Sequence, residues 1–273
     1  MKIRKRMRKD YYQIVENYYD SDAPDFDLRY WKNPVLQRIR QDFREHVKRF
    51  EFGEMLEIGY GTGLDLEHFA ATFSSARIAG IDISGEMQKI ASMRLIRQRL
   101  GNAMAYKGSV EDLQELFGEQ SFDMVVVFFG ALNTVEELKK AAELIDRQTK
   151  PGGHLVLSFV NKYYLGGMLI ELLKLRPRAA FSRLRSVWGG YSPSQFLPSR
   201  CYTPSAVQDA FADFRLVKRK GYSIVHPAWY YHRLNRILGR ACGVLWRLDE
   251  WLNRSLLWRF GEYTLFVFQK PNR

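Results

Sequence analysis

A glycine-rich turn constrains this chain more than any other feature. Residues 55–65 read Met-Leu-Glu-Ile-Gly-Tyr-Gly-Thr-Gly-Leu-Asp, so a short apolar run enters the turn and an amphipathic run leaves it. This pattern predicts a strand, a turn and a helix over residues 64–73. Gly59, Gly61 and Gly63 have no Cβ, which permits positive φ and lets a ligand lie against the peptide groups. The free N–H groups at the start of the helix then face that ligand.

Strands and helices are predicted to alternate through residues 51–160. After the strand that enters the turn, further strands are expected at residues 77–82, 103–107, 121–129 and 154–160. A helix at 84–100 and a helix that opens on a Thr134/Glu137 capping box separate them, and a Pro-Gly-Gly turn at 151–153 leads into the last. Five strands alternating with helices imply a doubly wound α/β fold with a parallel sheet.

Residues 1–50 are expected to form a tail and helices ahead of this core. Six of the first nine residues are basic, which predicts a frayed tail. An aromatic helix or turn at 11–20 and a polar loop at 21–27 follow. Asn33 and Pro34 then provide an N-cap and a proline at the first helical position, so a helix is predicted to run to about residue 50.

Beyond residue 160 the alternation stops. Residues 161–202 are expected to form a cap insertion, with an apolar stretch at 165–175 that predicts a packed helix and a Pro/Ser/Gly-rich loop. Residues 203–273 are expected to complete the core with a helix after Thr203, a strand at 214–225 and a last strand at 262–269. A helical insertion at 227–260, in which four tryptophans lie among arginines, interrupts this part.

Composition limits the class of protein. The chain has 273 residues, of which 46% are hydrophobic and 26% charged, as in a globular protein with a sizeable core. Cys201 and Cys242 lie far from any metal-binding spacing, so no metal site or disulfide framework is indicated, and a cytoplasmic location is predicted. No apolar run is long enough to span a bilayer, and no secretory signal is present. The net charge of +12 favours anionic partners.

The stretch Glu57-x-Gly-x-Gly-x-Gly63 resembles the first motif of class I S-adenosylmethionine-dependent methyltransferases. Its third glycine follows the second by two residues, whereas the dinucleotide fingerprint has a spacing of three. Asp82 follows Gly59 by 82 − 59 = 23 residues, close to the offset of about 20 at which an acidic residue meets a ribose. The resemblance covers about residues 52–160 and the last two strands. It implies a Rossmann-like, mostly parallel sheet with an antiparallel last strand and helical cap insertions.

The same resemblance implies the position of the nucleoside of S-adenosylmethionine. Asp82 would hold the ribose, and Ile83 and Met87 would flank the adenine. A helix-capping role is the alternative for Asp82. Residues 109–111 would lie against the adenine ring, although Glu111 also fits the first turn of a helix.

The methionine end of the cofactor would meet a second group of residues. Glu57 resembles the family's acidic residue beneath the amino group, while Phe129 and Gly130 resemble the lip of the fourth strand beside the methyl group. The full set of predicted cofactor-binding residues is Glu57, Gly59, Tyr60, Gly61, Gly63, Asp82, Ile83, Met87, Ser109, Val110, Glu111, Phe129 and Gly130.

Candidate acceptor-binding residues lie at three places in the sequence. An aromatic segment that includes Tyr11, Tyr12 and Tyr19 resembles the N-terminal lid of small-molecule methyltransferases, with packing on the sheet as the alternative. Asn161 and Tyr164 follow the fifth strand, where ligands collect in open α/β sheets. His226, at the end of the sixth strand, is the candidate general base, with a surface role as the alternative.

The sequence lacks the motifs that mark several subclasses of methyltransferase. Residues 128–133 read Phe-Phe-Gly-Ala-Leu-Asn, not the Asn/Asp-Pro-Pro-aromatic tetrad of nucleic-acid and glutamine N-methyltransferases. Neither the Pro-Cys context of base C5 methylation nor the carboxylate set of magnesium-dependent enzymes is present. We therefore expect in-line methyl transfer to a small-molecule or lipid-linked acceptor, at oxygen rather than nitrogen.

Two alternative functions and one further partner are kept as hypotheses. An RNA methyltransferase would hold phosphates on the basic tail and the arginine-rich cap. A scaffold that binds the cofactor without turnover fits the lack of an evident base. The tryptophan and arginine residues of 227–260 also suggest peripheral contact with an anionic membrane surface, with a buried helix face as the alternative.

Overall fold

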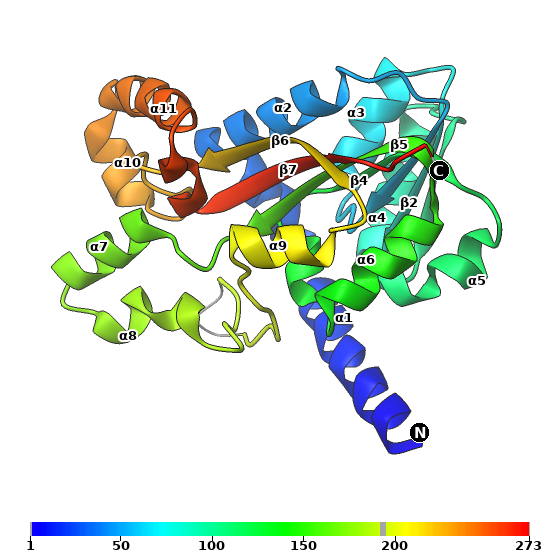
Figure 1. Cartoon of the computed structure of the whole chain (residues 1–273), viewed down its shortest axis with the longest axis horizontal. Helices are drawn as coiled ribbons and strands as arrows, with labels where there is room; N and C mark the ends of the chain where they lie inside the picture. Colours follow the sequence, from blue (N-terminus) through cyan, green and yellow to red (C-terminus); the bar gives the residue numbers. More distant parts are fainter. Residues whose placement is uncertain (1, 192–194, 273) are drawn as a thin grey trace.

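The computed structural model describes residues 2–191 and 195–272, which form a twisted sheet with helices on both faces (Figure 1). Among these residues, seven strands lie in the order β3-β2-β1-β4-β5-β7-β6. The strands are β1 (Glu54–Ile58), β2 (Arg77–Asp82), β3 (Ala103–Lys107), β4 (Phe122–Val127), β5 (Thr149–Val160), β6 (Arg215–Tyr222) and β7 (Tyr263–Gln269). Strands β1 to β5 pair in parallel, and β7 is antiparallel to β5 and β6. The predicted fold class is confirmed.

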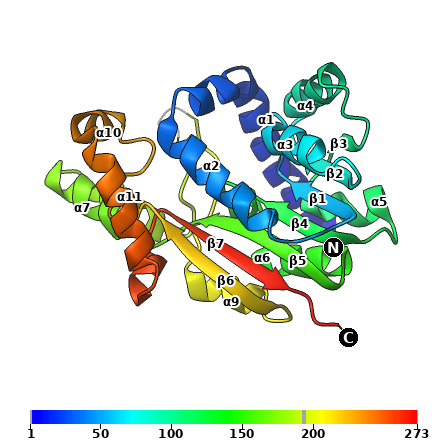
Figure 2. The ribbon, with the colours of Figure 1, turned by 90° about the horizontal axis from the view of Figure 1, so that it is seen from above.

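Two apolar layers hold the helices against the sheet. On one face lie α2 (Pro34–Val47), α3 (Leu64–Thr72) and α4 (Gly85–Arg97), and Phe43 and Phe69 are fully buried there. On the other face lie α5 (Leu113–Phe117), α6 (Leu138–Arg147) and α9 (Pro204–Ala210), packed around Ile145 and Phe211 (Figure 2). Since both faces are covered, a ligand has to bind at an edge. The strand order reverses between β1 and β4, where open α/β sheets bind ligands at the carboxyl ends of the strands.

Local capping signals begin α2 and α9 where these helices were predicted. The side-chain oxygen of Asn33 accepts hydrogen bonds from Val35 N at 3.1 Å and Leu36 N at 3.2 Å, and Pro34 is the first residue of α2. Thr203 likewise caps α9 through Ala206 N at 3.1 Å. These caps satisfy N–H groups that have no partner within the helix.

The predictions of a frayed tail at the N-terminus and of a polar loop at 21–27 are wrong, whereas residues 11–20 are helical. One helix, α1 (Lys2–Trp31), replaces the frayed tail, the short aromatic segment and the polar loop, and it includes Pro24. Contacts with other parts of the fold explain why these residues are helical. Val15 and Ala23 are buried against the rest of the protein, and Asp27 forms an ion pair with Arg94 of α4. Packing of this kind overrides the weak local helix preference of residues 21–27.

Two predictions after β4 also need correction. Thr134 does not open a capping box. Its hydroxyl donates to Ala131 O at 2.7 Å within the 3-10 helix η2 (Ala131–Thr134), and α6 begins only at Leu138. A Thr side chain that bonds locally in this way competes with helix capping. The Pro-Gly-Gly segment at 151–153 lies inside β5, at a shift in its register with β4, rather than before the strand.

Two helical insertions lie beside the sheet, in the regions where they were predicted. The first insertion contains α7 (Leu165–Leu173), α8 (Pro177–Ala180) and η3 (Ser182–Leu184), and the second contains α10 (His232–Leu238), α11 (Ala241–Leu252) and η4 (Leu256–Phe260). The helix expected at 165–175 is present as α7, but it packs on one side only, because Leu165, Leu169 and Leu173 are exposed. None of the described helices is both long and apolar enough to cross a bilayer. The cytoplasmic location stays a prediction.

Replacement of Asn133 by alanine is expected to lower the free energy of unfolding by about 2–4 kcal/mol, because three buried hydrogen bonds are lost. The Asn133 side chain accepts from Val160 N at 2.9 Å and donates to Val160 O at 3.1 Å and Arg200 O at 2.6 Å. Urea unfolding at constant m-value measures the change. Asn17→Ala, on the exposed face of α1, is the control and should change stability by less than about 0.5 kcal/mol. Equal losses in the two variants would contradict the assignment.

Candidate functional site

A cavity of about 220 Å³ lies at the carboxyl edge of the parallel strands. Its lining comes from the residues that follow β1, β2, β3 and β4, from the end of β5 and from Tyr263 at the start of β7. Helix α1 covers one side, and another side is covered by Trp229 of the second insertion and by five residues of the first, which are Trp188, Gly190, Tyr191, Leu197 and Ser199. The edge of the sheet therefore meets both insertions at one cavity.

The glycine turn borders this cavity through two of its three glycines. Gly59 and Gly61 line it with φ of 74° and 59°, and a Cβ on Gly59 would come within 2.3 Å of the Ala131 Cβ. Gly63 does not line the cavity. Its absent Cβ instead allows α3 to approach Ala91 of α4, where a Cβ would lie 2.8 Å away. Tyr60 also points elsewhere, because its hydroxyl donates to Tyr106 O at 2.9 Å.

Asp82 ends β2 inside the cavity wall. Its carboxylate accepts hydrogen bonds from Gly61 N at 2.8 Å and Ser84 N at 3.0 Å. Burial raises the pKa of Asp82 to about 6, against the opposing effect of these backbone donors. Since a carboxylate offers about four lone-pair sites, acceptor capacity remains for a ligand. Ile83 and Met87 line the cavity beside it, as predicted from the sequence.

The loop after β3 brings two of its three predicted residues to the cavity. Ser109 and Val110 line it, and Ser109 N donates to Asp112 at 2.7 Å in a capping box that fixes the loop. Glu111 does not line it, because its carboxylate forms an ion pair with Lys140 of α6. The hydroxyl of Tyr12 lies 3.4 Å from Glu111 Oε1. Glu111 therefore contacts Tyr12, which lines the cavity, but does not line the cavity itself.

A buried arginine is the main residue on the cofactor side that the sequence analysis missed. Arg40 of α2 lines the cavity, forms an ion pair with Asp65 and stacks 4.7 Å from the Phe129 ring. The signal was present in the sequence, because Arg40 lies on the apolar stripe between Leu36 and Phe43. A cation at such a position needs a buried partner.

Glu57 lies behind the wall and not in it. The side chain is buried, and its Oε2 has no hydrogen-bond partner among the residues that the structure describes. Burial, followed by the charge of Asp65, raises the pKa of Glu57 well above the usual range. The residues that follow β4 form the next part of the cavity wall. Phe129 and Gly130 line the cavity with φ of 51° and 79°. A positive φ at phenylalanine is a strained conformation that recurs at functional sites.

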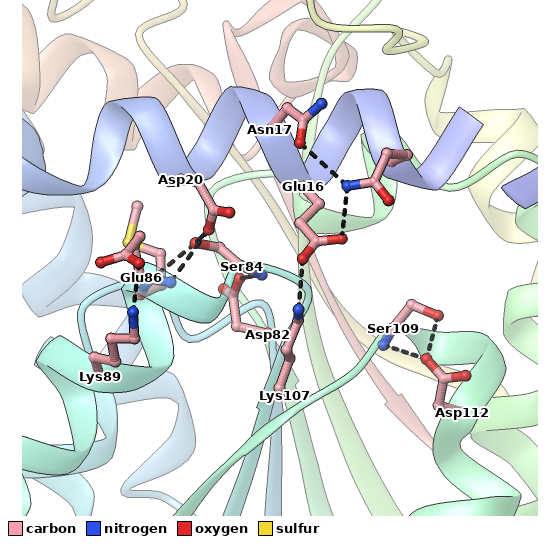
Figure 3. Close-up of polar contacts among 12 residues, drawn as sticks. Glu16, Asn17, Asp20, Asp82, Ser84, Glu86, Lys89, Lys107, Ser109 and Asp112 are labelled. Atoms are coloured by element: carbon pink, nitrogen blue, oxygen red, sulfur yellow. Dashed lines mark hydrogen bonds and ion pairs between the residues drawn. The ribbon is translucent and has the colours of Figure 1, made fainter. Parts of the chain in front are cut away.

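Helix α1 lies across the cavity and is held there by polar contacts. Figure 3 shows Asp20 of α1 at the start of α4, where it accepts from Ser84 Oγ at 2.6 Å and Glu86 N at 3.2 Å. Glu16 pairs with Lys107 of β3 at 2.5 Å. Tyr12 and Tyr19 line the cavity, whereas Tyr11 donates to Pro198 O at 2.6 Å and lies outside the lining.

The insertions and β7 contribute a second hydrogen-bonded group that the sequence did not reveal. Tyr191 lines the cavity and donates to the buried Glu262 Oε1 at 2.7 Å. Its hydroxyl is also 3.1 Å from that of Tyr263, and Arg183 pairs with Glu262 at 3.1 Å. Burial raises the pKa of Glu262, while Arg183 and Tyr191 oppose that rise. Trp188 and Trp229 complete an aromatic wall around this group.

Besides Tyr11, three further sequence-predicted acceptor residues do not line the cavity. The buried side chain of Asn161 donates to Arg259 O at 2.7 Å and Gly261 O at 2.8 Å, so it ties β5 to the second insertion. The Tyr164 hydroxyl accepts from Ala228 N at 3.1 Å and packs between the insertions. His226 lines a second hollow, and its Nδ1 is 2.8 Å from Pro227 O. Burial lowers the pKa of His226, and its position outside the cavity removes it as the candidate base.

Comparison with known proteins identifies the family. A model described as a methyltransferase domain matches residues 56–157. The ubiquinone/menaquinone biosynthesis C-methyltransferase UbiE of Geotalea daltonii is 32% identical over 156 residues, which cover 52% of this chain and 61% of that protein. The erythromycin 3″-O-methyltransferase of Saccharopolyspora erythraea is 28% identical over 228 residues, which cover 77% of this chain and 69% of that protein.

Solved structures agree in fold. The methyltransferase in a Haloferax volcanii complex with the Trm112 methyltransferase activator has a TM-score of 0.60 at 17% identity, over 95% of this chain and 98% of that chain. The match to the methyltransferase domain spans the glycine turn, Asp82 and the lip after β4. The family implies S-adenosylmethionine as the cofactor. The chain belongs to the class I S-adenosylmethionine-dependent methyltransferases.

Proposed function

We propose that this enzyme transfers a methyl group from S-adenosylmethionine to an oxygen atom of a small-molecule or lipid-linked acceptor. The observation that carries the proposal is a single cavity with two unlike halves. One half contains the glycine turn and Asp82, and the other contains aromatic rings and the hydrogen bond from Tyr191 to Glu262. Such an arrangement suits a charged nucleoside cofactor beside an apolar acceptor with one hydroxyl group.

The residues present fit S-adenosylmethionine. Gly59 and Gly61 leave a cradle that a side chain would fill. Asp82 has acceptor capacity for the ribose hydroxyls, and Ile83 and Met87 provide apolar contact for the adenine. When bound, the cofactor supplies a methyl group on a positively charged sulfur.

Other residues extend this cofactor site. Ser109 and Val110 would border the adenine, and Phe129 and Gly130 the methyl group, as the family resemblance implies. Arg40, which the predicted set did not include, offers a cation for the methionine carboxylate, while Glu57 supports this end from behind the wall. Tyr60, Gly63 and Glu111 would act indirectly, because they pack behind the residues that line the cavity.

The protein's contribution to the reaction is alignment, exclusion of water and acceptance of one proton. In-line transfer needs the acceptor oxygen about 3 Å from the methyl carbon in a dry site, and the rings of Phe129, Tyr263 and Trp229 border that region. As the new O–C bond would form and the methyl–sulfur bond of the cofactor would break, leaving a neutral thioether, the acceptor hydroxyl would give its proton to the Tyr191 oxygen. Tyr191 passes its own proton to Glu262, whose raised pKa suits it to hold that proton.

The oxygen preference and the acceptor class rest on this hydroxyl-rich wall. Relatives include proteins named as C- and O-methyltransferases, so the relatives alone do not choose the atom. A hydroxyl acceptor needs a group that takes its proton, and Tyr191 with Glu262 provides one. The aromatic wall favours an apolar acceptor over an RNA chain.

Asp82→Ala and Gly61→Val are expected to weaken S-adenosylmethionine binding by about 10- to 100-fold. The first removes a charged hydrogen-bond acceptor worth about 1.5–3 kcal/mol. The second places a branched side chain at a φ of 59°, within 3.4 Å of the Phe26 ring. Isothermal titration calorimetry measures the dissociation constant, with the exposed Asp209→Ala on α9 as control. Parental affinity in both variants would contradict the cofactor site.

Cofactor affinity is expected to rise with pH through about 6. The pKa of Asp82 is raised to about 6, so at pH 5 only about one carboxyl in ten is ionised and able to accept from both ribose hydroxyls. The dissociation constant at pH 5 should be about tenfold higher than at pH 8, by calorimetry. Asp82→Asn removes this titration and should flatten the profile. A flat profile in the parent protein would argue against ribose binding by an ionised Asp82.

Tyr191→Phe is expected to reduce kcat about 100-fold or more, because the route from the acceptor to Glu262 is interrupted. A panel of phenols, hydroquinones and sugars, assayed with labelled S-adenosylmethionine, provides the acceptor. Tyr163→Phe, on an exposed tyrosine outside the cavity lining, is the matched control. Glu262→Gln should show the same loss if circular dichroism shows that it folds. Parental kcat in Tyr191→Phe at every pH would exclude the relay.

A further inference from the structure

We propose that the end of the molecule built by the two insertions docks on the surface of an anionic lipid membrane. This end consists of the outward faces of α7 and α11 with the arginines beside them, and we refer to it as the docking face. The proposal deepens the proposed function, on which it rests for the lipid-linked class of acceptor. Its own evidence is the distribution of apolar and basic side chains on the two insertions.

Helix α11 turns one apolar stripe inward and a second one outward. Trp246 and Leu252 are buried against the core. Val244, Leu248 and Trp251, at spacings of four and three residues, share the opposite face and are exposed. A soluble helix ordinarily carries charge on its outer face, so a second apolar stripe requires an explanation.

Helix α7 repeats this arrangement. Leu165, Leu169, Leu172 and Leu173 recur at helical spacing and are all exposed, and Leu175 follows immediately after the helix. The exposed fractions of Leu169, Leu173, Leu175, Ile237, Val244 and Trp251 lie between 59% and 88%. Apolar side chains concentrated in this way differ from the single exposed residues that any protein surface contains.

The two helices belong to the same end of the molecule. Figures 1 and 2 both show α7 beside α10 and α11, away from α4 and α5 at the other end. A small cluster in which Ile170 of α7 and Leu234 of α10 pack around Tyr164 and Tyr231 joins the insertions. The two exposed apolar stripes therefore belong to one continuous structural unit.

The charge of the two insertions indicates which kind of partner binds the docking face. Residues 165–187 and 232–257 contain ten lysines and arginines against three acidic residues, and of the ten basic residues Arg183 is buried in its ion pair with Glu262 and is not part of the outward surface. Those three are already engaged: Glu171 pairs with Lys174, Glu250 pairs with Lys220, and Asp249 accepts from the backbone N–H groups of residues 224–226. The docking face consequently presents a net positive charge together with its leucines, which is the chemistry that binds anionic lipid headgroups and their acyl boundary.

The basic side chains lie among the apolar ones. Arg240, Arg247 and Arg254 recur every seven residues beside the outward stripe of α11, and all three are exposed. Within the part of the chain that the structure describes, none of them has a carboxylate partner. A second copy of this chain fits this face poorly, because a symmetric dimer would bring like charges together.

The docking face is next to the acceptor half of the cavity. Trp188 of the first insertion and Trp229 of the second line the cavity, so both insertions reach from the docking face to the site. Trp229 also lines the second hollow, which Lys32, Arg38 and Arg236 border and to which none of the carboxylates in the described part of the chain contributes. An acidic headgroup in that hollow would lie one side chain away from the cavity.

Vesicle flotation tests the proposal on the full chain. Vesicles of phosphatidylcholine with phosphatidylglycerol should bind the protein, with affinity falling as salt rises, and pure phosphatidylcholine vesicles should bind it at least tenfold more weakly. Trp251→Glu should reduce binding to the anionic vesicles at least tenfold, while the matched control Ile96→Glu, on exposed α4, should not. Arg247→Gln should cost about fivefold, and the equally exposed Arg97→Gln on α4 should cost nothing measurable.

Other outcomes would overturn the docking face. No binding to anionic vesicles at low salt, or equal binding by Trp251→Glu and Ile96→Glu, contradicts it. So does a dimer in analytical ultracentrifugation that Trp251→Glu dissociates, because a second copy would then cover the face. Calorimetry with S-adenosylmethionine on the same samples separates the two proposals. If Trp251→Glu loses vesicle binding but keeps the parental affinity for S-adenosylmethionine, the docking face is supported. If the parent protein binds vesicles but not S-adenosylmethionine, only the proposed function is refuted.

Discussion

The carboxylate of Asp82 is the point on which the arrangement of this site depends. It holds the glycine turn through Gly61 N and the start of α4 through Ser84 N, and Ser84 in turn donates to Asp20 of α1 (Figure 3). Three hydrogen bonds thus connect the glycine turn, α4 and α1, the helix that covers the cavity. Because the carboxylate is buried and its pKa is raised, its interactions replace water and impose the geometry of the cavity wall.

The parts of the fold that were predictable from the sequence are those with local signals. Glycine spacing, the Asn33 cap and apolar strands act within a few residues, and the structure has these elements at or near the predicted positions. Helix α1 was missed because burial of Val15 and Ala23 and the pairing of Asp27 with Arg94 depend on distant residues. Tyr191 and Glu262 are 71 residues apart, and no pattern in either neighbourhood announces their hydrogen bond.

Buried ion pairs stand at both ends of the cavity. Arg40 with Asp65 flanks the proposed cofactor half, and Arg183 with Glu262 flanks the acceptor half. Burial of each ion costs several kcal/mol, and apolar residues of similar volume are often at least as stable. Stability alone therefore does not account for charges at these positions. Their presence around one cavity, and the unpartnered Oε2 atoms of Glu57 and Glu262, instead agree with groups kept for a ligand or a proton.

The two insertions contribute both to the cavity wall and to the outer surface of the protein. Their inward residues, Tyr191 and Trp229, line the cavity, and their outward residues expose leucine, tryptophan and arginine. A sheet edge with α1 alone would leave the acceptor half open to water, which weakens the electrostatic control that transfer requires. Since the insertions that cover the cavity also carry the exposed apolar stripes on α7 and α11, an acceptor that partitions into a membrane could reach the cavity along the proposed docking face. A water-soluble acceptor would gain nothing from that arrangement.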